Sequence, residues 1–153
     1  MRYQFLVVFL VLLSIDLGIK YYLNSQEFDS FTLIPFLLDF LLVKNTGVAF
    51  SLLSSSNMLI QLALILIIMT ALGFLIYSFF KTTDNLQKIA LVLILSGGFG
   101  NFIERLFYGS VTDYLYLHFG KTPLFIFNFA DLLITIGACI IIFVWLSGNE
   151  QKD

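Results

Sequence analysis

Charge is what this sequence has least of. Only 12% of its 153 residues are Asp, Glu, Lys or Arg and 59% are hydrophobic, whereas soluble domains carry about 25% charged residues. So little charge does not cover a water-facing surface, which excludes an ordinary soluble domain. The formal net charge of −2 excludes a strongly basic nucleic-acid surface, so we expect no nucleic-acid partner. We interpret residues 1–153 as a single integral membrane domain.

Cysteine and histidine are nearly absent as well. Cys139 is the single cysteine, which excludes an intrachain disulfide and a thiolate metal cluster. His118 is the single histidine, so the HExxH motif of zinc proteases is excluded and no metal site is expected. We interpret His118 as an interface residue and Cys139 as a core residue.

Long hydrophobic runs are abundant. Four of them, at residues 3–22, 58–80, 89–106 and 127–146, have about the 20 apolar residues that a bilayer-spanning helix needs. The first begins after Arg2 like a signal peptide, but no small-residue cleavage site follows it, so we interpret it as an uncleaved anchor. The sequence thus predicts an all-α membrane protein, a bundle of four transmembrane helices.

Local signals refine this bundle. Asp84, followed by Gln87 three residues later, predicts a helix cap before the third span. Within that span, Ser96, Gly97 and Gly100 leave room for another backbone to approach closely. The connections at residues 23–57 and 107–124 have the composition of strands. Because unpaired strand edges are not tolerated in hydrocarbon, we expect these strands to pair at the water boundary.

Polar residues gather near one end of the predicted bundle. If the helices alternate in direction, this end faces away from both termini. Its polar residues are Asp16, Lys20, Asn45, Asn101, Glu104, Arg105, Asp113, Asn128 and Asp131. Polar groups converging from five chain segments on one end of an apolar bundle indicate a functional site.

Asp113 and Asp131 are the strongest candidates for chemistry. A carboxylate costs about 2.5–3.5 kcal/mol at the centre of a membrane helix, so such residues are functional candidates by default. Two neighbouring carboxylates in a low dielectric share one proton, and such a pair suits the acid–base chemistry of aspartic proteases. The residues alone leave three interpretations open: a catalytic pair, structural polar contacts, or a proton relay.

The other polar residues also have alternative roles. Asp16 and Lys20 stand four residues apart, a spacing that forms a helix salt bridge. Arg105 either extends to lipid headgroups or holds a substrate or lipid carbonyl. Asn128 lies three residues before Asp131 and is placed to donate an amide hydrogen bond to it. Asn45, in a turn with Gly47, is a turn residue first and a substrate contact second.

The orientation follows from the basic residues. The side of the termini carries Arg2, Lys81, Lys88 and Lys152, and the other side carries Lys20, Lys44, Arg105 and Lys121. This count is a tie, but Lys20 and Arg105 lie in helix ends beside acidic neighbours and are set aside for a local role. The remaining four against two predict cytoplasmic termini.

Five short blocks, in order along the chain, resemble the bacterial lipoprotein signal peptidases (signal peptidase II) over nearly the whole sequence. They are residues 16–20 (Asp-x-x-x-Lys), 44–51 (Lys-Asn-Thr-Gly-Val-Ala-Phe-Ser), 97–105 (Gly-Gly-Phe-Gly-Asn-Phe-Ile-Glu-Arg), 111–114 (Val-Thr-Asp-Tyr) and 128–131 (Asn-Phe-Ala-Asp). Three positions depart from the family pattern: Glu104 replaces the usual Asp, Tyr114 a common Phe, and Leu132 a small residue.

The resemblance implies a membrane aspartic endopeptidase with Asp113 and Asp131 as the catalytic pair. Its substrates would be prolipoproteins with a diacylglyceryl cysteine, cut on the N-terminal side of that cysteine. Four residues would bind substrate or orient the catalytic pair: Asn45, Asn101, Arg105 and Asn128. Asp16, Lys20 and Gly47 would support the site.

The resemblance also implies the setting of the reaction. The enzyme would lie in the bacterial cytoplasmic (inner) membrane, with its active site toward the outer face. The two long connections would form a small extracytoplasmic β-cradle. We expect a monomer that contacts membrane lipids and needs no cofactor.

Three other classes of protein compete with this one. A proton-coupled transporter would spread its acidic residues across the membrane depth, and a membrane scaffold would not need paired acids. A serine–lysine peptidase would need a desolvated lysine base, whereas Lys44 lies beside a polar turn.

Overall fold

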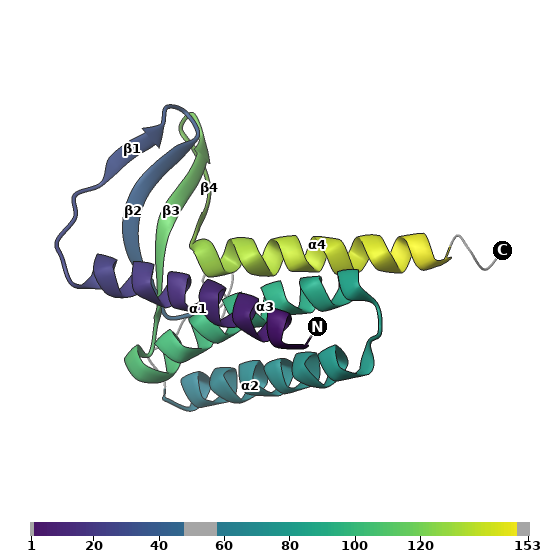
Figure 1. Ribbon diagram of the computed structural model, residues 1–153. Helices are drawn as coiled ribbons and strands as arrows, with labels where there is room; N and C mark the ends of the chain where they lie inside the picture. Colours follow the sequence, from purple (N-terminus) through teal and green to yellow (C-terminus); the bar gives the residue numbers. More distant parts are fainter. Residues whose placement is uncertain (1, 48–57, 150–153) are drawn as a thin grey trace.

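The computed structural model describes residues 2–47 and 58–149, which contain four long helices (Figure 1). These are α1 (Arg2–Asn24), α2 (Met58–Lys81), α3 (Asn85–Tyr108) and α4 (Phe129–Asn149). Each helix is long and apolar enough to cross a membrane, which confirms the four predicted spans. The largest difference is at α3, which begins at Asn85 and not at residue 89. Residues 48–51 of the second sequence block lie outside the described residues.

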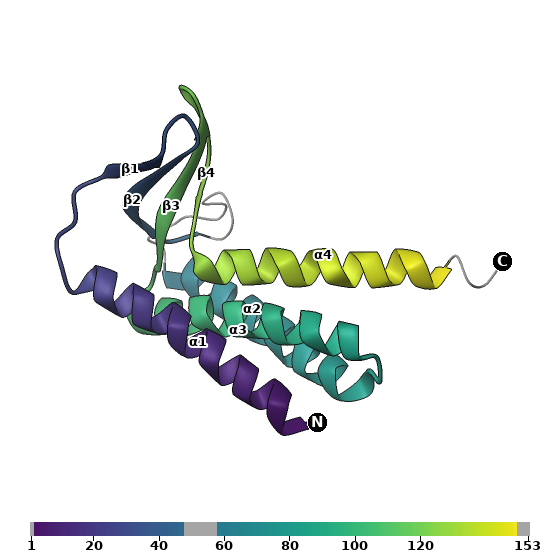
Figure 2. The same cartoon turned by 45° about the horizontal axis from the view of Figure 1, so that its top comes forward.

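The helices alternate in direction, and α3 packs against each of the other three. Both ends of the described chain lie at the same end of the bundle, as Figure 2 also shows. Leu66, Ile67 and Phe74 of α2 are exposed, as expected for side chains that face lipid. Cys139 is exposed too, so its interpretation as a core residue was wrong: it lies on the outward side of α4.

A four-stranded antiparallel sheet stands at the opposite end of the bundle from the termini (Figure 1). Its strands are β1 (Phe31–Ile34), β2 (Leu38–Asn45), β3 (Val111–Phe119) and β4 (Thr122–Phe127), in that spatial order. The expected pairing between the two connections is confirmed, because β2 pairs with β3. In their register Val43 lies opposite Asp113 and Asn45 lies opposite Val111. This register brings the end of β2 next to the beginning of β3.

The two ends of α3 follow from local sequence. The predicted cap is confirmed at its start, where the Asp84 carboxylate accepts a 2.7 Å hydrogen bond from the Gln87 backbone N–H. Its last turn closes at Gly109, whose N–H donates to the Arg105 carbonyl at 2.9 Å. Gly109 has a φ of 69°, a left-handed conformation that glycine adopts without strain. The chain thereby reverses sharply, and β3 begins two residues later.

Glycines allow α3 to approach its neighbours closely, as the sequence predicted. A Cβ atom at Gly97 would collide with the backbone carbonyl of Ala130, and one at Gly100 would collide with the Asp16 carboxylate. The first contact brings α3 against the beginning of α4, and the second brings it against α1. The glycines of α3 therefore determine where the polar ends of three helices meet.

We expect Gly97→Ala to lower the free energy of unfolding by about 1–3 kcal/mol, because the new methyl group forces α3 and α4 apart. Thermal unfolding in detergent measures the effect. Gly73→Ala in α2 is the matched control, since a Cβ there meets no atom within 4 Å. Equal unfolding temperatures for the two variants would contradict the packing described here.

Candidate active site

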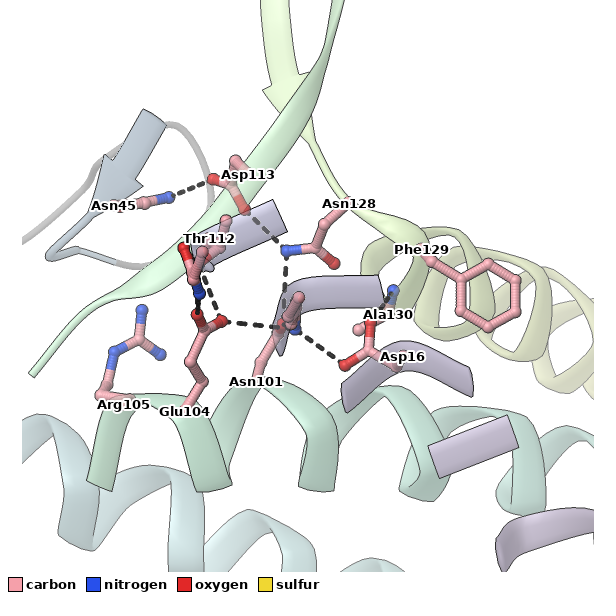
Figure 3. Close-up of polar contacts among 12 residues, drawn as sticks. Asp16, Asn45, Asn101, Glu104, Arg105, Thr112, Asp113, Asn128, Phe129 and Ala130 are labelled. Atoms are coloured by element: carbon pink, nitrogen blue, oxygen red, sulfur yellow. Dashed lines mark hydrogen bonds and ion pairs between the residues drawn. The ribbon is translucent and has the colours of Figure 1, made fainter. Parts of the chain in front are cut away.

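Asp113 projects from β3 into a buried polar cluster (Figure 3). Its side chain is 3% exposed. One carboxylate oxygen accepts a 2.9 Å hydrogen bond from the Asn45 side-chain amide of β2, and the other accepts one of 2.6 Å from the Asn128 side-chain amide. Asn45, Asp113 and Asn128, predicted as site residues, are therefore brought together by the sheet and by the beginning of α4.

Asp131 is held in the first turn of α4 by a reciprocal cap. The Asn128 side-chain oxygen accepts from the Asp131 backbone N–H at 3.0 Å, and the Asp131 carboxylate accepts from the Asn128 backbone N–H at 3.0 Å. The predicted amide hydrogen bond from Asn128 to Asp131 is present, but it comes from the Asn128 backbone N–H and not from the side chain. Because the oxygen of that side chain caps the helix, its NH₂ group points to Asp113 instead.

Asn128 thus joins the two predicted catalytic carboxylates. Asn101 completes the arrangement: its amide donates to the second Asp131 oxygen at 2.9 Å, and its oxygen accepts from Lys20 at 2.6 Å. The Asn101 oxygen also accepts from the Asn128 amide at 3.3 Å. Each carboxylate therefore receives a hydrogen bond to both of its oxygens.

Two further side chains close the beginning of α4. Asp16 forms the predicted salt bridge with Lys20, at 2.8 Å, and it also accepts from the Ala130 backbone N–H at 3.1 Å. The Tyr114 hydroxyl accepts from the Phe129 backbone N–H at 3.1 Å. Tyr114 was not predicted as a site residue, although its departure from the family's common Phe was a signal that an oxygen is used here.

Arg105 lies inside the site. Its side chain is only 4% exposed, and its guanidinium donates to the Gly47 carbonyl (Arg105 is drawn in Figure 3). The alternative that Arg105 extends to lipid headgroups was therefore wrong. The Gly47 N–H in turn donates to the Asn45 side-chain oxygen at 2.9 Å, which orients the Asn45 amide toward Asp113. Arg105 and Gly47 thus support the turn that follows β2.

Two side chains in this cluster were not predicted. Thr112 is fully buried beside Asp113 and contacts Glu104, and Asn24 at the end of α1 donates to both of these residues. The signal for Thr112 was its place directly before Asp113, within the block of residues 111–114. Asn24 carried no comparable signal, because a polar residue is ordinary at the end of a membrane helix.

Burial raises the pKa of Asp113 above its ordinary value, and the nearby charge of Asp131 adds to this effect. Hydrogen bonds from Asn45 and Asn128 oppose the rise without cancelling it. Burial likewise raises the pKa of Tyr114 to about 12, so its hydroxyl stays protonated at neutral pH. A carboxyl group with a raised pKa beside a second carboxylate is placed to hold the proton that the pair shares.

The fold and the site define a multi-pass membrane protein with a paired-carboxylate site suited to acid–base catalysis. The profile of the family described as Signal peptidase (SPase) II matches residues 8–147. This chain belongs to the signal peptidase II family and is a peptidase.

Individual relatives agree with the family assignment. The chain is 36% identical over 154 aligned positions to the lipoprotein signal peptidase of Pelagibacter ubique, covering 98% of this chain and 92% of that protein. It is 35% identical to the lipoprotein signal peptidase of Lactobacillus gasseri, covering 97% and 95%. A solved structure described as a bacterial membrane enzyme superposes with a TM-score of 0.82 at 29% identity, covering 98% of this chain and 92% of that one.

We expect Asn128→Ala to lower peptidase activity per folded molecule at least about tenfold, because the Asp113 carboxylate and the Asp131 backbone lose the side chain that joins them. The variant should also lose about 1 kcal/mol of stability with its helix cap. Asp84→Ala is the control, since it removes the cap of α3 at the other end of the bundle. Cleavage rates and unfolding temperatures separate the two effects, and full activity in Asn128→Ala would contradict the arrangement.

Proposed function

We propose that this protein removes signal peptides from prolipoproteins as a membrane aspartic endopeptidase, with Asp113 and Asp131 as its catalytic pair. The observation that carries the proposal is the Asn128 side chain, which hydrogen bonds to both residues and holds them in one buried cluster. The names of the relatives as lipoprotein signal peptidases support the choice of substrate.

The proposed substrate class follows from the resemblance of the five sequence blocks to the lipoprotein signal peptidases. We assign prolipoproteins whose lipobox cysteine carries diacylglycerol, cut on the N-terminal side of that cysteine. A diacylated substrate is confined to the bilayer, so its signal peptide lies among membrane helices while the scissile bond stays near the interface. Asp113 lies in β3 and Asp131 in the first turn of α4, at the sheet end of the bundle, which supports this assignment because water for hydrolysis is available at an interface.

In the proposed chemistry one carboxyl group acts as the base and the other as the acid. Asp131 lies at the N-terminus of α4, which favours negative charge, and it would take a proton from the attacking water. Asp113, whose pKa is raised by burial, would hold the shared proton and donate it to the scissile carbonyl oxygen. In the resulting tetrahedral intermediate the C–N bond then breaks: protonated Asp131 gives its proton to the leaving amine nitrogen, and Asp113 takes a proton back from a hydroxyl of the intermediate as the carboxyl product forms.

The remaining site residues would orient this pair. Asn45, Asn101 and Asn128 donate amide hydrogen bonds to its carboxylates. Asn45 and Asn101 are only partly buried and would contact substrate as well, whereas Asn128 is fully buried and would orient the pair. Arg105 and Gly47 hold the turn that carries Asn45. Asp16 and Lys20 support the site from α1 through Ala130 and Asn101.

We assign the site to the outer face of the bacterial cytoplasmic membrane, with cytoplasmic termini. Lys20 and Arg105 are 2% and 4% exposed and engaged within the site, which supports leaving them out of the count of topogenic charges. The four-stranded sheet would then be extracytoplasmic. We expect the chain to act as a single domain and a monomer in contact with lipid.

We expect Asp113→Asn and Asp131→Asn each to reduce cleavage by about 10²–10⁴-fold, because each removes one partner of the acid–base pair. The assay uses purified protein and a diacylglyceryl-modified prolipoprotein. Asp29→Asn, an exposed loop substitution, is the matched control. Failure of the unsubstituted protein on this substrate, or full activity in either variant, would refute the proposal and direct attention to proton-flux assays.

The rate should depend on pH in a bell-shaped manner. As pH rises through the raised pKa of Asp113, the pair loses the proton that it donates, so kcat/KM falls on the alkaline side. At low pH both carboxyls are protonated and no base remains. Asn45→Ala should move the alkaline limb to higher pH, because the Asn45 hydrogen bond lowers the Asp113 pKa. A profile that rises continuously with pH would contradict these roles.

A further inference from the structure

Glu104 occupies a position that the chemistry proposed above does not use. It lies in the last part of α3 and is 3% exposed. One carboxylate oxygen accepts a 2.8 Å hydrogen bond from the Thr112 backbone N–H, and the other accepts from the Thr112 hydroxyl (Figure 3). Both oxygens therefore hold a single residue of β3, and that residue directly precedes Asp113 in the chain.

Two ammonium groups balance the buried charge of Glu104. The Lys20 Nζ atom of α1 lies 3.7 Å from one of its oxygens, and the Lys44 Nζ atom of β2 lies 3.7 Å from the other. Lys44 also donates to the Thr112 hydroxyl oxygen at 2.7 Å. A buried carboxylate is costly without such partners. Glu104 therefore ties α1, β2 and β3 to α3 at one point.

Glu104 is also connected to Asp131, the second member of the proposed catalytic pair. Lys20, which faces Glu104, donates to the Asn101 oxygen at 2.6 Å, and Asn101 donates to Asp131 at 2.9 Å. Two short routes thus leave Glu104. One passes through Thr112 to the backbone of Asp113, and the other passes through Lys20 and Asn101 to the Asp131 carboxylate.

Glu104 lies on a different side of the polar cluster from the carboxylate pair. With Lys20 and Lys44 it lines a cavity of about 550 Å³ between α1 and α3. Neither Asp113 nor Asp131 is among the described residues that line this cavity. A change at Glu104 therefore reaches the pair through the residues between them.

We propose that Glu104 is a positioning residue that sets the placement of both catalytic carboxylates, by clamping Thr112 and by anchoring Lys20. The proposal rests on the proposed function of the Asp113–Asp131 pair. It also gives a role to the carboxylate at position 104, where the family's usual residue is Asp: the Glu104 side chain reaches both polar groups of Thr112 while remaining close to the two lysines.

Replacing Glu104 by Gln keeps the length of the side chain and removes its charge. The Gln amide would then direct a donor toward a Thr112 donor or a lysine, so the clamp is lost. We expect kcat to fall at least about tenfold with little change in KM, because the carboxylates are displaced without loss of a substrate contact. Glu104→Asp, which keeps the charge, should recover most of the activity.

The pH profile of kcat/KM should shift in Glu104→Gln. Loss of folded protein alone would lower the activity without shifting this profile. The charged groups facing Asp113 are Lys20, Arg105 and Asp131, and those facing Glu104 are Asp16, Lys20, Lys44 and Arg105. In Glu104→Gln the lysines lose an anionic partner, so they favour ionised Asp113 more strongly. The alkaline limb of kcat/KM should therefore move to lower pH, opposite to Asn45→Ala.

The experiment compares unsubstituted protein, Glu104→Gln, Glu104→Asp and Glu27→Gln, all purified as monodisperse protein in detergent. Glu27 is exposed in the connection after α1 and serves as the matched control. Cleavage of a diacylglyceryl-modified prolipoprotein gives kcat, KM and the pH profile. Hydrogen exchange at the Thr112 amide reports the clamp without reference to activity.

Faster Thr112 exchange, a lower kcat and a shifted alkaline limb in Glu104→Gln alone, with recovery in Glu104→Asp, would support the proposal. Unchanged Thr112 exchange, or unchanged kcat and pH profile in folded Glu104→Gln, would overturn it. Failure of the unsubstituted protein to cleave would refute the proposed function instead, and Thr112 exchange would then still decide whether Glu104 holds β3.

Discussion

The site depends on one constraint, the burial of the N-terminus of α4. The first backbone N–H groups of a helix have no partner within it, and a buried donor without an acceptor costs free energy. Here the Phe129, Ala130 and Asp131 N–H groups find side-chain acceptors on Tyr114, Asp16 and Asn128. These acceptors come from β3, from α1 and from the residue before α4. Satisfying the helix end therefore brings these segments together around Asp131.

The same contacts explain how several charges are accommodated beside an apolar bundle. Asp16, Lys20 and Glu104 are each at most 3% exposed, yet Lys20 lies within 3.7 Å of both carboxylates and bonds to Asn101. A buried charge is tolerated when it is paired and hydrogen-bonded. Burial raises the pKa of Asp113, and the Asn45 and Asn128 amides at its oxygens oppose this rise without cancelling it. Asp113 is therefore the group assigned to hold the proton.

Much of this arrangement follows from local patterns. Hydrophobic runs locate the four helices, Asp84 and Gln87 mark the beginning of α3, and glycines mark its close contacts. Spacing along one helix also predicts the Asp16–Lys20 salt bridge. Spacing failed where a side chain has partners far away in the sequence. Asn128 has a cap to satisfy and a distant carboxylate to contact, and Arg105 turns inward because the Gly47 carbonyl lies within its reach.

The sequence by itself settles which residues are polar, in which helices and connections they stand, and that they collect at one end of the bundle. Those properties depend on neighbours within a few positions, where periodicity and capping act. The joining of Asp113 to Asp131 through Asn128, and the hold of Glu104 on Thr112, depend on strand register and on the approach of α3 to α1 and α4. Hydrogen bonds of 2.6–3.0 Å need placement that only the packed helices and sheet supply.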